Sequence, residues 1–154
     1  MVACYPLSYQ ATAALPDGLR VTYTIQPMFG FHSDWTRRIG VRYGQNQIHQ
    51  QLFEDTGWWR GSNLYRHKSG AYVIDEGEIG CFGFTVKPLS FDVPTSILCD
   101  KHVVAQKVQG DASRFYVDLM YLGTFIETPN AADDAPISFV PAAEMAEIAL
   151  PDGL

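Results

Sequence analysis

Hydrophobic and polar residues alternate with a period of two along much of this chain, which is typical of half-buried β-strands. The pattern predicts a hairpin over residues 7–25, because Pro-Asp-Gly at 16–18 favours a tight turn between two alternating runs. It predicts a second hairpin over residues 64–74, where Gly70 can adopt the positive φ that such a turn needs.

Further alternating runs predict more strands between residues 79 and 127. They fall at residues 79–86, 102–108, 114–122 and 124–127. Residues 27–31 break the regular pattern, and the stretch from there to Gly44, which is rich in glycine, arginine and aromatic residues, is the least predictable region of the chain. Many short strands separated by glycine and proline favour an antiparallel β-sandwich or a partly open barrel over a parallel βαβ fold. The predicted class is mostly β.

Two short helices complete the predicted fold. Asn46 is a suitable N-cap for a helix over residues 46–54, in which Ile48 and Leu52 share a face at four-residue spacing. Pro141 is a suitable first residue for a C-terminal helix that ends before Pro151. We therefore divide the chain into three parts: a β-rich domain at residues 1–128, a linker at 129–136 and a C-terminal helical segment at 137–154.

The size of the chain and its cysteines limit the class of protein. At 154 residues it is long enough for one domain with a core of its own. The three cysteines, Cys4, Cys81 and Cys99, are scattered and form no metal-ligand spacing, which argues against a disulfide scaffold or a zinc site. We see neither a signal peptide nor a membrane-spanning run. We expect a soluble protein in the cytoplasm or another reducing compartment.

Charge is distributed unevenly. The net charge of −6 argues against general binding to nucleic acids, because polyanions repel an acidic protein at long range. Membrane insertion is not expected, because no apolar run is long enough. Residues 31–68, however, carry six basic residues against three acidic ones, whereas residues 69–154 carry four against thirteen. The middle segment also contains all three tryptophans and three of the four histidines. A recognition surface is therefore expected in this segment.

Tryptophan, tyrosine and arginine are the residue types enriched at interface hot spots, because they combine rigid apolar area with directional donors. Alternate residues of a strand point to opposite faces, so one of the two adjacent tryptophans is expected to face outward and the other inward. The predicted binding residues are Arg42, Trp58, Trp59, Arg60, Tyr65, Arg66 and His67.

No catalytic motif is present. The chain has no phosphate-cradling glycine loop, no nucleophile elbow and no HExxH pair, and we predict no cofactor and no metal. The carboxylates at 75–78 are interpreted as a solvated hairpin turn.

The sequence thus predicts a non-enzymatic protein-binding or structural module that docks to a protein partner, associates with itself or forms a small component of a larger assembly. Two alternatives stay open. One is a small hydrolase in which an acid and His67 or His102 meet only in the fold. The other is a glycan-binding module that uses Trp58 or Trp59.

Overall fold

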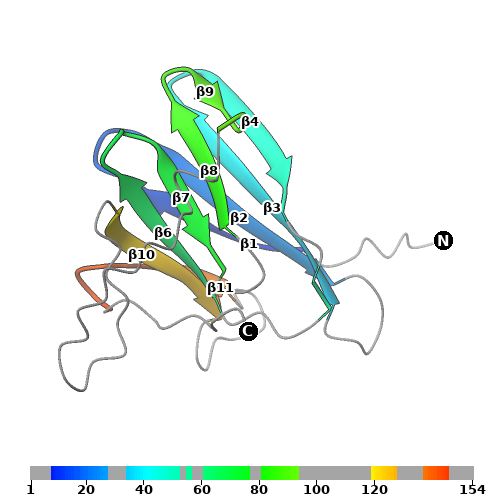
Figure 1. Cartoon of the computed structure of the whole chain (residues 1–154). Helices are drawn as coiled ribbons and strands as arrows, with labels where there is room; N and C mark the ends of the chain where they lie inside the picture. Colours follow the sequence, from blue (N-terminus) through cyan, green and yellow to red (C-terminus); the bar gives the residue numbers. More distant parts are fainter. Residues whose placement is uncertain are drawn as a thin grey trace. The chain divides into compact units, whose positions relative to one another are not determined.

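The computed structural model describes residues 8–27, 34–52, 55–56, 61–76, 81–93, 119–127 and 137–145. All of its regular elements are strands, and they form two sheets with antiparallel pairing (Figure 1). The predicted mostly-β class is confirmed. The chain divides into two compact units, residues 1–59 with 127–138 and residues 60–126 with 139–154.

The first sheet contains five strands. Four of them lie in the order β1-β2-β3-β4, with bounds Tyr9–Ala14, Arg20–Pro27, Asp34–Tyr43 and Asn46–Gln51, and the two-residue β5, Asp55–Thr56, also pairs with β3. The predicted first hairpin is confirmed as β1 and β2. Its turn is closed by hydrogen bonds from Leu15 N–H to Leu19 O and from Gly18 N–H to Leu15 O, and Gly18 has a φ of 84°.

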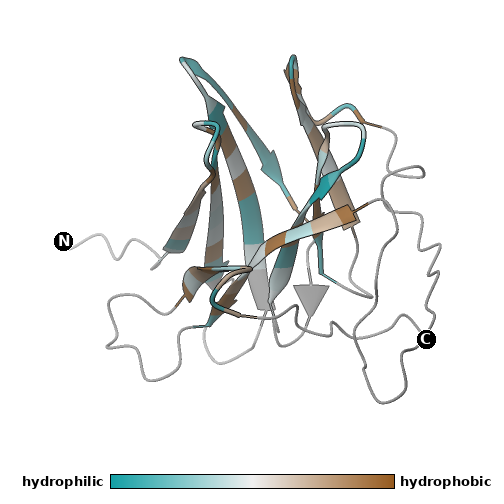
Figure 2. Cartoon of the chain, turned by 90° about the vertical axis from the view of Figure 1, so that its left-hand side faces the viewer, coloured by the Kyte–Doolittle hydropathy of each residue, from teal (hydrophilic) through white to brown (hydrophobic). Residues whose placement is uncertain are grey.

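Residues 34–43, within the stretch that was least predictable from the sequence, form the longest strand of this sheet. One side of β3 carries Ile39 and Val41 into the core, where both are fully buried. Arg37 occupies the same side and is also buried, and this charged residue obscures the period-two pattern in the sequence. Bands of hydrophobic and hydrophilic colour alternate along several strands of the chain (Figure 2).

The predicted helix over residues 46–54 is wrong for the residues that the structure describes, since 46–51 are strand β4. A four-residue spacing, as between Ile48 and Leu52, places two residues on one face of a strand as well as of a helix. Gly44, with a φ of 61°, permits a tight turn after β3, so the backbone of this segment pairs with β3 instead of with itself.

The second sheet has six strands in the order β11-β10-β6-β7-β8-β9. Their bounds are β6 Ser62–His67, β7 Tyr72–Asp75, β8 Cys81–Val86, β9 Leu89–Ser90, β10 Leu119–Glu127 and β11 Ile137–Pro141. The second predicted hairpin is confirmed as β6 and β7, with Gly70 at a φ of 90°. The predicted strand at 79–86 is confirmed from Cys81 onward, whereas the one at 102–108 lies outside the described residues.

Two predicted strands on either side of Gly123 are a single strand, β10. Its register with β6 shifts between Tyr121 and Gly123, so a β-bulge takes up the extra residue. Gly123 has a φ of 150°, and a Cβ there would lie 2.5 Å from the carbonyl oxygen of Val140, within the space of β11. The glycine is therefore required for the close approach of these two strands.

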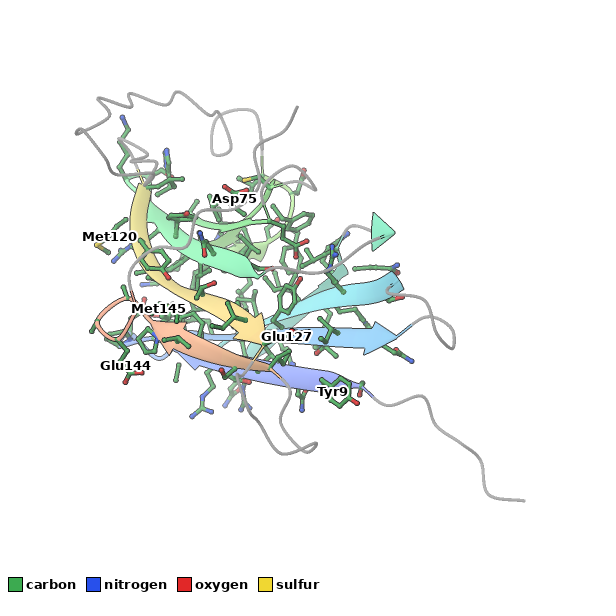
Figure 3. The ribbon with its side chains drawn as sticks, turned by 90° about the horizontal axis from the view of Figure 1, so that it is seen from below. Tyr9, Asp75, Met120, Glu127, Glu144 and Met145 are labelled. Carbon is green, nitrogen blue, oxygen red and sulfur yellow. The ribbon has the colours of Figure 1, made fainter. Side chains whose placement is uncertain are left out.

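The predicted C-terminal helix does not begin at Pro141, because that residue ends strand β11. A turn follows, in which the backbone N–H groups of Glu144 and Met145 both donate to the carbonyl of Pro141. Figure 3 labels Glu144 and Met145 at this turn. Residues 146–154, which would form the rest of the predicted helix, lie outside the described residues, as does the predicted linker.

Aromatic rings fill the core of the second unit. The rings of Tyr72 and Phe84 stack with their centroids 5.3 Å apart, and Phe125 packs at 4.9 Å from Phe139. A cluster formed by Tyr65, Ala71 and Val73 is covered in part by other residues of this unit, namely Cys81, Val93, Leu119 and Tyr121. Both faces of β6 and β7 are mostly buried, which makes these two strands the centre of the unit.

Cys81 is disulfide-bonded, and the other two cysteines of the chain lie outside the described residues. The scattered spacing of the cysteines had argued against a disulfide scaffold. The reducing compartment stays a prediction from the sequence.

Candidate functional site

Some of the predicted binding residues are exposed in the structure and others are buried. Arg42 is exposed on β3 and Arg66 is exposed on β6, whereas Tyr65 is only 2% exposed and His67 only 6%. Strand alternation explains the difference on β6, because Tyr65 and His67 share the face opposite to Arg66. The side chains of Tyr65 and His67 are thus part of the core. Residues 58–60, with the two adjacent tryptophans and Arg60, lie outside the described residues.

His67 has a structural role in the turn of the β6–β7 hairpin. Its Nδ1 atom accepts a hydrogen bond from the backbone N–H of Ser69 at 3.1 Å and lies 2.8 Å from the hydroxyl of the same residue. The N–H of His67 itself donates to the carbonyl of Ala71. These contacts hold a buried imidazole against its own turn, so they do not support the hydrolase alternative for His67. His102 lies outside the described residues.

The carboxylates predicted to be solvated are buried where the structure describes them. Asp75 and Glu76 are 5% and 2% exposed, and the Ser62 hydroxyl donates a buried hydrogen bond of 2.9 Å to Glu76 Oε1. Asp75, labelled in Figure 3, is the last residue of β7. A buried carboxylate requires such polar partners to offset its lost hydration. The interpretation as a solvated turn is therefore wrong for these two residues.

The first sheet presents one face made of polar side chains, which we call the polar face. The register aligns it in three rows across strands β1 to β4. The rows are Gln10, Thr24, Arg38 and Gln51; Thr12, Thr22, Gly40 and His49; and Ala14, Arg20, Arg42 and Gln47. Every residue of these rows is exposed or half-buried except Gly40.

The opposite face of the same strands is apolar, and this difference orients the sheet. Val21, Tyr23 and Ile25 of β2 are buried with Ile39 and Val41 of β3. Because side chains alternate, burying these residues leaves the intervening positions of each strand on the solvent side. The polar face is therefore the outer surface of the first sheet.

The polar face carries positive charge only. Its three arginines, Arg20, Arg38 and Arg42, are all exposed, and none of the three rows contains an acidic residue. Among the residues that the structure describes, no hydrogen bond or ion pair engages any of the three guanidinium groups. Strand β3 does begin with an acid, Asp34, at about 13 Å along the strand from Arg38 at the usual rise per residue. The surface is thus a local cationic area on an acidic protein.

Only Arg42 of this face was among the predicted binding residues. Arg20 lies outside the basic segment at 31–68, and Arg38 and His49 lie outside residues 58–67, which contain most of the predicted binding residues. The alternation of Arg38, Gly40 and Arg42 was the signal that would have identified the face. Arg37, adjacent to Arg38 but buried, concealed it.

Other kinds of site find no support in the described part of the chain. No group of three or more His, Cys, Asp or Glu side chains lies together there in an arrangement that would hold a metal ion. None of the described residues belongs to a helix of the length and apolar character needed to span a membrane. Searches with this chain against protein-family models, curated proteins and solved structures gave no match.

Proposed function

We propose that this protein is a β-rich binding module that docks to an acidic surface of a protein partner through its polar face. The observation that carries the proposal is the set of three exposed arginines, with no carboxylate in their rows and no partner among the described residues. Like charges on neighbouring strands reduce stability, so such a set is expected where it has a binding role.

The composition of the polar face suits a protein partner. Glutamine and threonine side chains surround the arginines, and Thr12 and Thr22 are hydrogen-bonded to each other at 2.9 Å. Neutral polar groups can form hydrogen bonds with a partner's backbone and side chains, while arginine forks bind carboxylates in bidentate fashion. Because the whole molecule is negatively charged, an anionic partner is expected to contact only the polar face, which a short acidic segment can do and a long nucleic acid cannot.

The proposal is tested by the binding of a labelled polyglutamate peptide to the full chain, followed by fluorescence anisotropy at several salt concentrations. The variant Arg38→Gln/Arg42→Gln should bind the peptide at least about tenfold more weakly and with a flatter salt dependence. Arg66→Gln removes an exposed arginine from the other sheet and is the matched control, which should bind like the parent protein.

Two results would overturn the proposal. One is equal peptide affinity in the parent and in Arg38→Gln/Arg42→Gln, provided that circular dichroism shows both to be folded. The other is tighter binding of a single-stranded oligonucleotide than of the peptide at the same ionic strength, since that would make the face a nucleic-acid surface.

A further inference from the structure

Gly40 lies between the two arginines of β3 on the polar face. Arg38 and Arg42 are its neighbours two residues away on the same side of the strand, at about 7 Å each. Because Gly40 has no side chain, nothing on β3 stands between the two arginines. Both guanidinium groups can therefore reach toward the same point above Gly40.

The imidazole of His49 lies against this point. His49 is directly opposite Gly40 in the register, and a Cβ built on Gly40 would be 3.0 Å from its Nδ1 atom and 3.2 Å from its Cε1 atom. The ring therefore leans across the strand over the glycine backbone. On the other side of Gly40, the nearest side-chain atom is Cβ of Thr22, at 4.0 Å from the same built atom.

We propose that Arg38, Arg42 and His49 form a site for a dianionic tetrahedral oxyanion, presented as a phosphate ester on a segment of the protein partner. This inference deepens the proposed function and rests on it for the identity of the partner. Two guanidinium groups match the charge of a phosphate ester near neutral pH, which is about −1.5 to −2. A carboxylate, with one negative charge, would leave one arginine without compensation.

The number of donors also favours a phosphate. Each guanidinium offers a planar fork of N–H groups, and the imidazole adds a ring N–H. Three terminal phosphate oxygens accept hydrogen bonds from several directions at once, whereas the two oxygens of a carboxylate lie in one plane. Arginines placed on either side of Gly40 along β3, with the imidazole on β4, suit the tetrahedral group.

The test uses the full chain and NMR titrations of its backbone amides with inorganic phosphate, sulfate and acetate at constant ionic strength. Phosphate and sulfate should shift the amides of residues 38–42 and 48–50, and acetate should bind about tenfold more weakly. His49→Gln should weaken phosphate binding more than it weakens polyglutamate binding. Arg66→Gln is the matched control and should change neither affinity.

A phosphoserine peptide identifies the source of the anion. It should bind more tightly than inorganic phosphate, and its unphosphorylated counterpart should not bind at the site. Equal affinity for the peptide and for inorganic phosphate would overturn the phosphorylated segment as the ligand.

Equal affinity for acetate and phosphate would overturn the oxyanion site itself. The proposed function would survive that result if polyglutamate binding still depended on Arg38 and Arg42. Conversely, selective phosphate binding without polyglutamate binding would support the site and overturn docking to a carboxylate surface. The two failures are thus distinguishable.

Discussion

Arg20 and Arg42 lie directly opposite each other on the adjacent strands β2 and β3, and both side chains are exposed. Side chains at directly opposed positions have their Cβ atoms about 5 Å apart, so the two positive charges repel each other in the folded protein. Among the described residues, no acidic side chain forms an ion pair with either arginine.

Removing one of these charges should therefore stabilise the protein while weakening its binding. Arg20→Gln is expected to raise the free energy of unfolding by about 0.2–1 kcal/mol at low salt. The gain should shrink as salt screens the repulsion in the parent protein. Urea denaturation at low and high salt measures both effects, and Arg66→Gln serves as the control. A loss of stability at low salt would show that Arg20 makes favourable contacts instead.

The second prediction concerns the approach of β11 to the bulge in β10. In Gly123→Ala the new Cβ would overlap the Cζ atom of Phe139, so the ring and the β11 backbone must move. Overpacking together with a strained φ should cost about 3 kcal/mol. Gly44→Ala separates these contributions, because its φ is also positive but nothing lies within 4 Å of its Cβ. Equal losses of stability in the two variants, measured by thermal unfolding, would mean that β11 moves away from the new Cβ at no cost.

The third prediction concerns the buried hydrogen bond between Ser62 and Glu76. Ser62→Ala removes the hydroxyl donor 2.9 Å from a buried carboxylate oxygen and should cost about 1.5–3 kcal/mol, the range for hydrogen bonds to charged groups. Ser90→Ala removes a hydroxyl that accepts from the Asp92 N–H at an exposed position, and it should cost about 1 kcal/mol or less. Chemical denaturation compares the two. A Ser62→Ala protein as stable as the parent would show that the hydroxyl contributes nothing to the stability of the buried carboxylate.

The fourth prediction concerns Cys81. Purified protein should gain the mass of two hydrogen atoms on reduction, and Cys81 should resist alkylation until a reductant is added. Loss of the bond in Cys81→Ala should lower stability by about 2–4 kcal/mol under oxidising conditions. The difference in stability between the variant and the parent should become smaller in reductant, because the parent then also lacks the disulfide. The difference that remains is the contribution of side-chain packing. Prompt alkylation of Cys81 in the native, unreduced protein would contradict the prediction.

The fifth prediction returns to the adjacent tryptophans, which remain candidates for the apolar part of the interface. Of Trp58→Ala and Trp59→Ala, one should lose stability and the other should lose about 2 kcal/mol or more of partner affinity through faster dissociation. The measurement pairs thermal unfolding with dissociation kinetics of the phosphoserine or polyglutamate complex. Loss of stability in both variants, with unchanged binding by folded protein, would place both rings in the core.

Local patterns predicted the hairpins well but wrongly assigned residues 46–51, which form a strand, to a helix. The turns at Gly18 and Gly70 were both predicted correctly. Each turn needs a positive φ at one position, and a glycine at that position is visible in the sequence. The segment at 46–54 has a spacing compatible with both a helix and a strand. Its pairing with β3 was decided by a strand that the sequence pattern did not reveal.

The candidate site shows the same division. Arg42 was expected from the local charge balance, but its grouping with Arg20, Arg38 and His49 depends on the register of three strands. Register is set by which face is buried, and here the burial of Arg37 with Ile39 and Val41 places Arg38 and Arg42 outside. Tyr65 and His67 look like surface recognition residues in the sequence, yet the packing of β6 makes them core residues.

The β class, the turns at Gly18 and Gly70 and the local excess of positive charge follow from residues that are close together in the chain, because they depend on period-two alternation, on single glycines and on formal charge. Which of those charges share one face, and which polar groups are buried, depends on the packing of the folded chain. Cross-strand neighbours are distant in sequence, and their alignment depends on how a whole sheet buries its apolar side.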